Sequence, residues 1–565
     1  MATLFLCWLL LGAFSTLIGW TAWRVAAHTC AAGFTESLPA EVLSLAGLAL
    51  LTGILQLISL FWAIGPAVQA LAAVVALALA VGQRQALVAE LGRWPAQWRT
   101  GGWHAVLLGS LLWLWLLTLA TIPTTNFDAG LYHLQSLRWI AEYPAVPGLG
   151  NLHGRLAFNP SVFVPTALFR YSTPYGTAYG LGSYLFAVLA VAAARAVSGG
   201  LQKTGGADVR WVWAPPLLLF LLLWTFQVWL SCPTPDHFVT VPVAFAFLLY
   251  ARKWAQGHGE RLDATTVLVL LLTLWAATIK LAALPALLLP LHSLWASRGE
   301  LTTRWLLLTV GVGTLLVGPW LARNVVLSGY LIYPLPALDL FSVDWKVPSW
   351  YAHMEQNMIA NLGQRAAQSP FSAPRQTLLQ WLPGWWALET SYNRVVLLTA
   401  ATSPLVTAWR WRRVGTTETG WVVGWAVAWL GVAFWFLTAP DFRFAVAFLL
   451  VAGLWPWLAG FSALRLAQVR YLPWLLALLW TLQNLRDPLY QLRHQPLSMV
   501  PRLVWPALTP VPATVEVPVG SLRVRVPRVG AQCWGAPVPC VHCVEAGLAP
   551  RGASLRQGFR MLPNR

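Results

Sequence analysis

The sequence predicts an all-α, multi-pass membrane protein that ends in a small domain of short β-strands. Of its 565 residues, 58% are hydrophobic and only 10% are charged. The mean hydropathy of +0.61 is far above that of ordinary soluble domains. Apolar runs of about 17 to 22 residues recur along the chain, and helices of that length cross a bilayer. Because these runs do not alternate apolar and polar residues, they predict helices rather than barrel strands.

Apolar run length predicts about 13–14 transmembrane helices. The start of the chain lacks a basic segment and a cleavage site, so the first run is interpreted as a span. Lys280 interrupts a nearly continuous apolar run, which predicts a short chain reversal there. The candidate spans lie near residues 3–22, 42–60, 64–82, 104–123, 176–197, 212–231, 236–251, 264–280, 282–297, 304–322, 392–409, 420–438, 442–460 and 470–485.

Basic residues predict the orientation of these spans. The formal charge is +18 at pH 7, and short basic loops fall on every second connection, as the positive-inside rule predicts for the cytoplasmic side. The other connections carry unusual polar clusters, so we expect these clusters to converge on the external face. They comprise the segment from Asn126, Ser231 to His237, Lys280, the loop from Arg323 to Tyr392, Thr438 to Arg443, and the tail after Asn484. No basic stripe interleaves with aromatic residues, which argues against a nucleic-acid partner.

The same features divide the chain into five parts. These are additional N-terminal transmembrane helices (1–103), a transmembrane core (104–322) with an external loop (124–175), a long external loop (323–391), C-terminal transmembrane helices (392–485) and an external tail domain (486–565).

The tail predicts strands because the segment PVPATVEVPVGSLRVRVPRV alternates apolar and polar residues between Pro and Gly. Two interpretations of its clustered cysteines stay open. Cys533 and Cys540 could form a disulfide in an oxidising compartment. Alternatively, the two could bind a metal together with His542 and Cys543.

The segment 126–160 gathers polar groups directly after an apolar run. A partly desolvated carboxylate at Asp128 suits a general base or a ligand for Mg²⁺ or Mn²⁺. The alternatives are a solvated loop carboxylate or a helix N-cap. A helix is predicted after Asp128, and on it Tyr132 and Gln135 would lie on the same face as Asp128. His133 is a candidate for orienting a hydroxyl or binding metal, and the alternative is a hydrogen-bonded structural histidine.

Several cations are candidates for binding phosphate, because guanidinium groups match phosphate oxygens in pairs. Arg138, Arg155 and Arg323 belong to this group, although an arginine near a span end often only anchors that span at the interface. Lys280 lies between two apolar runs, where an unpaired charge is costly, and a phosphate partner would account for it. His153 lies in the same polar segment and is a further candidate for substrate binding.

Other charged residues open spans or occupy the long loop. Asp236 in SCPTPDH and the pair Asp441 and Arg443 in TAPDFR are candidates for the site. A helix cap at Asp236 and a structural ion pair at Asp441 and Arg443 are the alternatives. Three residues of the long loop are candidates for lining an acceptor groove, with a solvated loop as the alternative: Asp339, Asp344 and Lys346.

No nucleotide-binding motif is present, so the expected substrate is already activated and arrives from the bilayer.

The motifs FDAGLYHLQ, SCPTPD, DWKVP, APDFR and QCWG are similar to those of an uncharacterised bacterial family, common in Bacteroidetes-type genomes. In architecture the chain resembles the GT-C class of integral membrane glycosyltransferases. Members of that class use polyprenyl-phosphate or polyprenyl-pyrophosphate sugar donors.

The resemblance implies a catalytic or metal-binding Asp128 and donor-phosphate contacts from Lys280 or Arg323. The expected partners are therefore a polyprenyl-linked sugar and membrane lipid, with the site on the periplasmic face of a bacterial inner membrane. Two features depart from the GT-C pattern. The candidate loop follows the fourth predicted span rather than the first, and it carries a lone Asp rather than a D-D or D-E dipeptide. A lipid-linked saccharide flippase and a polysaccharide polymerase or ligase are the alternative functions.

Overall fold

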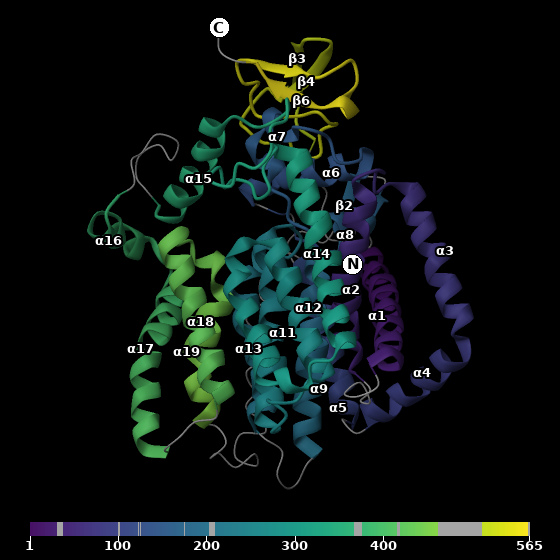
Figure 1. Cartoon of the computed structure of the whole chain (residues 1–565), viewed down its shortest axis with the longest axis vertical. Coiled ribbons are helices and arrows are strands. Elements are labelled where there is room, and N and C mark those ends of the chain that lie inside the picture. The colour runs from purple at the N-terminus through teal and green to yellow at the C-terminus, as the bar shows by residue number, and fades with distance from the viewer. Residues whose placement is uncertain are drawn as a thin grey trace, which may run out of the picture.

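The protein is mostly helical, with a small region of short strands at one end of the helix bundle (Figure 1). This confirms the coarse prediction of a helical membrane protein with a C-terminal strand region. The computed structural model describes residues 1–30, 38–99, 102–122, 124, 126–173, 176–202, 209–365, 376–414, 419–460 and 511–562.

Five helices of the described chain are long and apolar enough to cross a membrane. They are α1 (Ala2–Cys30), α2 (Ala40–Ser59), α11 (Pro235–Ala255), α14 (Thr303–Ser328) and α18 (Thr419–Thr438). The pair α3 (Pro66–Gly82) and α4 (Arg84–Arg99) bends by 79° and could form a sixth span. The predicted span 470–485 lies outside the described residues.

Further apolar helices complete the bundle, and their apolar segments are shorter than 18 residues. They are α5 (Gly102–Ala120), α9 (Leu181–Gln202), α10 (Val209–Phe226), α12 (Ala264–Ile279), α13 (Leu288–Ala296) and α19 (Val446–Gly460). One predicted boundary is wrong: residues 176–179 form strand β2 (Gly176–Tyr179), which pairs antiparallel with β1 (Arg170–Thr173). The helix of that predicted span therefore starts at Leu181.

The predicted reversal at Lys280 is confirmed. Lys280 ends α12 with extended backbone torsions, φ −153° and ψ 128°, and the 3-10 helix η4 (Leu281–Leu287) follows before α13. Extended torsions cannot continue a helix, so the chain turns back and η4 packs against α12. The lysine is thereby held at a helix end.

Glycines let α1 and α2 pack backbone to backbone. A Cβ at Gly19 would lie 1.9 Å from the Leu43 carbonyl oxygen, and one at Gly47 would lie 1.8 Å from the Ser15 carbonyl oxygen. Close backbone approach through small residues stabilises helix pairs in lipid, where apolar side chains alone provide no driving force. The hydroxyls of Ser15 and Ser44 hydrogen-bond across this interface at 2.8 Å.

Short helices cover one end of the bundle. The segment after α5 contains η1 (Ala129–His133), α6 (Leu134–Glu142), α7 (Leu149–Leu152), η2 (Gly154–Ala157) and α8 (Phe163–Leu168). The predicted long loop contains α15 (Ser349–Gly363) and α16 (Leu378–Leu388), and α17 (Ser391–Val414) follows. Helices α6, α7 and α15 lie close to the strand region in Figure 1.

The C-terminal strand region covers this end of the bundle. Strands β3 (Thr514–Val519) and β4 (Leu522–Pro527) form one antiparallel pair, within the segment whose alternation predicts strands. Strands β5 (Leu548–Pro550) and β6 (Phe559–Met561) form another. The Phe559 amide donates to the Pro147 carbonyl at 3.1 Å. Gly558, with φ +85°, allows this contact, because a Cβ there would lie 1.9 Å from the Pro147 oxygen.

Candidate functional site

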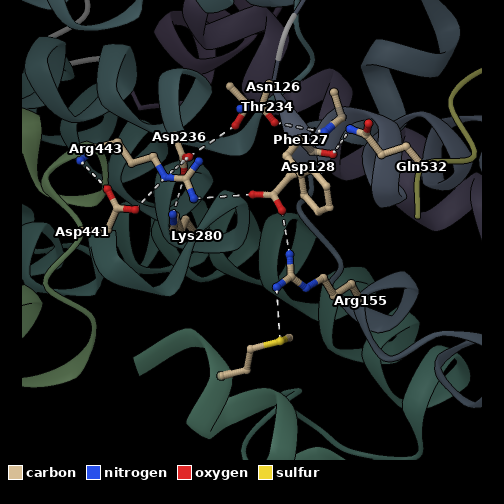
Figure 2. Close-up of polar contacts among 12 residues, drawn as sticks. Asn126, Phe127, Asp128, Arg155, Thr234, Asp236, Lys280, Asp441, Arg443 and Gln532 are labelled. Carbon is tan, nitrogen blue, oxygen red and sulfur yellow. Dashed lines mark hydrogen bonds and ion pairs between the residues drawn. The ribbon is translucent and has the colours of Figure 1, made fainter. Parts of the chain in front are cut away.

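Six charged side chains from distant parts of the chain form one ion-pair cluster, and Figure 2 shows them pointing toward one another. The polar segment after α5 contributes two of them, the start of α11 and the end of α12 contribute one each, and the turn between α18 and α19 contributes two. The cluster therefore contains three carboxylates and three cations, which we call the charge cluster: Asp128, Asp236, Asp441, Arg155, Lys280 and Arg443.

Asp128 lies between two guanidinium groups. Arg155 Nη1 donates to its Oδ1 at 2.7 Å, and Arg443 Nη2 lies 3.5 Å from its Oδ2. The Asp128 side chain is 20% exposed, so it is accessible from outside the cluster. The N-cap interpretation of Asp128 is wrong, because its side chain makes no capping hydrogen bond. Asn126 fills that role, since its Oδ1 accepts from the Ala129 amide at 3.0 Å.

The helix that begins after Asp128 starts with a π-helical turn. The Leu134 amide donates to the Ala129 carbonyl, five residues back, and such widened turns are frequent at functional sites. Tyr132 stays beside the cluster, with the Arg155 guanidinium 5.6 Å from its ring centre. Gln135 instead donates to the Ala536 carbonyl at 2.8 Å. The expectation that Gln135 shares the face of Asp128 is therefore wrong, since a π turn changes the angular spacing.

Asp236 holds the second half of the cluster together. Lys280 Nζ donates to its Oδ1, and Arg443 Nε lies 3.4 Å from its Oδ2 and 3.1 Å from Asp441 Oδ2. The Asp236 side chain is only 7% exposed, so its charge depends on these cations. Its position in the first turn of α11 adds the favourable end of the helix dipole. Lys280 Nζ also lies 3.1 Å from the centre of the Phe444 ring.

Two predicted phosphate-binding arginines lie outside the charge cluster. Arg323, within α14, donates to Asn159 Oδ1 at 3.1 Å and to Ser59 Oγ at 2.6 Å. It is buried among these neutral partners, so it ties α14 to α2. Arg138 pairs with Glu142 at 2.6 Å and donates to a C-terminal domain carbonyl. The hydrogen-bond and ion-pair partners of both arginines therefore lie outside the charge cluster, so neither guanidinium joins Lys280 there.

The predicted site histidines are buried and uncharged. Burial lowers the pKa of His133 to about 4 and that of His153 to about 3, so both imidazoles are neutral near pH 7. The His133 ring packs edge-on against Tyr132 at 4.3 Å between centroids. The His153 ring packs against His542 at 4.9 Å, outside the charge cluster. Neither imidazole therefore provides a positive charge that could bind a phosphate.

The charged residues of the long loop pair at the surface. Lys346 donates to Asp339, and Arg551 of the C-terminal domain holds both carboxylate oxygens of Asp344 at 2.8 Å and 3.0 Å. The Asp339 and Asp344 side chains are each 48% exposed. These contacts favour the alternative of a solvated loop and fasten the loop to the C-terminal domain.

The cysteine cluster contains a disulfide between Cys533 and Cys540, and Cys543 is a free, exposed thiol. The alternative metal site that uses all three cysteines is therefore wrong. Within the described residues, no group of three or more His, Cys, Asp or Glu side chains is placed to hold a metal ion.

Sequence reasoning missed four residues that contact the polar segment. Glu355 Oε2 lies 3.8 Å from Arg155 Nε, and Arg155 Nη2 lies 3.5 Å from Met358 Sδ. Both come from α15 in the long loop. Gln532 Nε2 donates to the Phe127 carbonyl at 3.0 Å, and the Trp534 amide donates to the Gly130 carbonyl at 2.9 Å. The QCWG motif was the one sequence signal that marked the last two.

Comparison with known proteins identifies a family of unknown function. No curated protein and no solved structure is significantly similar to this chain. Residues 1–450 match a family described as a domain of unknown function, DUF8201, and that match includes all six residues of the charge cluster. The chain therefore belongs to the DUF8201 family.

Proposed function

We propose that the protein is an integral membrane glycosyltransferase with a GT-C-like fold and 13–14 transmembrane helices. It transfers a sugar from a polyprenyl-phosphate or polyprenyl-pyrophosphate donor to a cell-envelope glycan, lipid or protein. The observation that carries this proposal is the partly exposed Asp128 carboxylate, held between Arg155 and Arg443 at one end of an apolar helix bundle. Charges maintained at such a place point to function.

The distribution of basic residues supports a periplasmic site. Lys253, at the end of α11, pairs at 3.0 Å with Asp263, just before α12. Arg298 follows α13, and Arg304 opens α14. These connections lie at the helix ends opposite to Asp236, Lys280 and the end of α14. By the positive-inside rule, that basic end faces the cytoplasm of a bacterial inner membrane.

The proposed chemistry is an inverting displacement at the sugar carbon that carries the phosphate. The bond between that carbon and the phosphate oxygen breaks, and its electron pair stays on the phosphate. A new bond forms to the acceptor hydroxyl oxygen, and the hydroxyl proton moves to the Asp128 carboxylate. Preorganised cations stabilise the charge that develops on the leaving phosphate. In this proposal Arg155 and Arg443 take that role, and both guanidinium groups contact Asp128 (Figure 2).

The charge balance of the cluster adds a requirement. Three carboxylates already face three cations, so the negative charges of the aspartates weaken the attraction of the cluster for a phosphate. Proton transfer to Asp128 removes one of these competing charges when the leaving phosphate gains negative charge. The cationic side chains therefore stabilise the leaving phosphate at the moment of transfer without a metal ion. Mg²⁺ or Mn²⁺ is optional in this scheme.

The experiment is mass spectrometry of lipid that co-purifies with the protein. Wild type should carry a polyprenyl-linked sugar, and Arg443→Lys should carry clearly less, because lysine cannot bridge three carboxylates as guanidinium does. Arg298→Lys, at the opposite end of the bundle, is the matched control and should retain the lipid. Equal lipid content in both variants, or no prenyl lipid in wild type, would contradict the proposal.

A further inference from the structure

Glu355 is a buried carboxylate beside the charge cluster. Its side chain, on α15, is only 4% exposed, and its Oε2 lies 3.8 Å from Arg155 Nε. Gly154 makes room for it, because a Cβ at Gly154 would lie 2.3 Å from Glu355 Oε1. Glu355 Oε2 accepts no hydrogen bond from any described residue. A buried carboxylate that is so poorly satisfied points to a role that depends on its protonation.

Arg155 therefore lies between two carboxylates but keeps unused donor capacity. Its Nη1 donates to Asp128 Oδ1 at 2.7 Å, and its Nε faces Glu355. Among the described residues, the one hydrogen-bond partner of its Nη2 is the Met358 sulfur, at 3.5 Å, and a thioether is a weak acceptor. An anionic oxygen would be a much stronger partner for Nη2. The flexible Met358 side chain can move aside to admit it.

We propose that Arg155 is the phosphate-binding subsite of the donor site, and that Glu355 couples phosphate binding to uptake of one proton. This inference rests on the proposed function and names the group that holds the donor. When both carboxylates are ionised, the trio of Asp128, Arg155 and Glu355 carries a net charge of −1 and repels an anion. When Glu355 is protonated, the trio is neutral, and Nη2 can receive the phosphate oxygen.

The ionisation of Glu355 falls in the physiological range. Burial raises the pKa of Glu355 to about 7, against the smaller opposing effect of Arg155. The other titratable groups that interact with Glu355 are Tyr333 and Tyr351. Burial raises the pKa of both phenols, so they stay neutral and do not compete for the charge. Binding of an anion should therefore be strongest below pH 7 and should weaken above it.

The experiment measures binding of farnesyl methyl phosphate, a prenyl phosphodiester with one fixed negative charge, to the full-length protein in detergent. Wild-type affinity should be constant in the acidic range and fall about tenfold per pH unit above pH 7. Glu355→Gln keeps the shape and removes the titration, so its affinity should stay flat across the range. Glu142→Gln, at the separate ion pair with Arg138, is the control and should retain the wild-type profile.

The outcomes separate this inference from the proposed function. A wild-type affinity that does not vary with pH, or a Glu355→Gln profile equal to wild type, would overturn the role of Glu355 while leaving prenyl phosphate binding in place. Failure of the probe to bind at any pH would overturn both. Dimethyl phosphate, which lacks the prenyl chain, should bind at least tenfold more weakly. Equal binding of the two probes would mean that the subsite takes a soluble anion, and would overturn the donor assignment.

Discussion

Asp128 and Arg443 are 315 positions apart in the chain, yet their side chains face each other at 3.5 Å. The contact joins the first polar segment after α5 to the turn between α18 and α19. Arg443 also reaches Asp236 and Asp441, so one guanidinium connects three carboxylates from three segments. The site is therefore a product of the whole transmembrane bundle.

The pair between Asp236 and Lys280 should be essential for stability. Lys280→Met leaves the buried Asp236 charge with Arg443 alone, and breaking a buried pair in this way costs about 3–5 kcal/mol. Thermal unfolding in detergent should show a strongly lowered midpoint. The double variant Asp236→Asn/Lys280→Met should recover part of the loss, because it removes both charges. Lys346→Met, at the exposed pair with Asp339, should change stability by less than about 1 kcal/mol. Similar losses in both lysine variants would contradict this account.

Gly130 should be required for docking of the C-terminal domain. A Cβ at this position would lie 2.5 Å from Trp534 Cε2, so Gly130→Val should push the QCWG loop away from the π-helical turn. Limited proteolysis should then release the C-terminal domain faster than in wild type. A Cβ at Gly313 of α14 would meet nothing within 4 Å, so Gly313→Val should leave the proteolysis rate unchanged. An unchanged rate in Gly130→Val would show that the loop does not depend on this contact.

The disulfide should stabilise the same loop. Cys533 and Cys540 flank the residues whose carbonyls accept from Gln135 and Arg138. Removing the link in Cys533→Ala/Cys540→Ala should cost roughly 2 kcal/mol and increase hydrogen exchange over residues 127–138. Cys543→Ala removes only the exposed free thiol and should leave exchange in that segment unchanged. If exchange does not change in the double variant, the disulfide does not hold the polar segment.

Stability should depend on pH through Glu355. Its pKa is raised to about 7 from an ordinary value of 4.5, so the folded protein binds a proton that the unfolded chain has already lost. The stabilisation is full below pH 4.5 and is lost as the pH rises to 7, with a total of at most about 3 kcal/mol. Unfolding midpoints of wild type should fall over this range relative to Glu355→Gln. A constant difference between the two proteins would contradict the shifted pKa.

The convergence of the charge cluster could be predicted from the sequence, because basic loops on alternate connections assign the other connections to one side of the membrane. Asp128, Asp236, Lys280 and Arg443 all come from those other connections. Their pairing follows from the cost of isolated charge in an apolar bundle.

Other parts of the site depend on tertiary contacts that the sequence pattern does not encode. In the sequence, Glu355 has the pattern of an ordinary acidic loop residue. Its burial depends on the packing of α15 on η2. Arg323 looks like a phosphate ligand at a span end, but Asn159 and Ser59 already accept its hydrogen bonds. Gln135 is displaced by the π turn, which helical spacing does not anticipate.

Sugar transfer by Asp128→Asn tests the central claim most directly. Proteoliposomes would receive polyprenyl-linked sugars extracted from the native membrane, and the released polyprenyl phosphate would be measured. Wild type should release it in the presence of acceptor, Asp128→Asn should be slower by roughly 100- to 10,000-fold, and Asp339→Asn should match wild type. Release by Asp128→Asn at the wild-type rate, or movement of intact lipid-linked sugar across the bilayer without release by wild type, would contradict the claim that Asp128 catalyses sugar transfer.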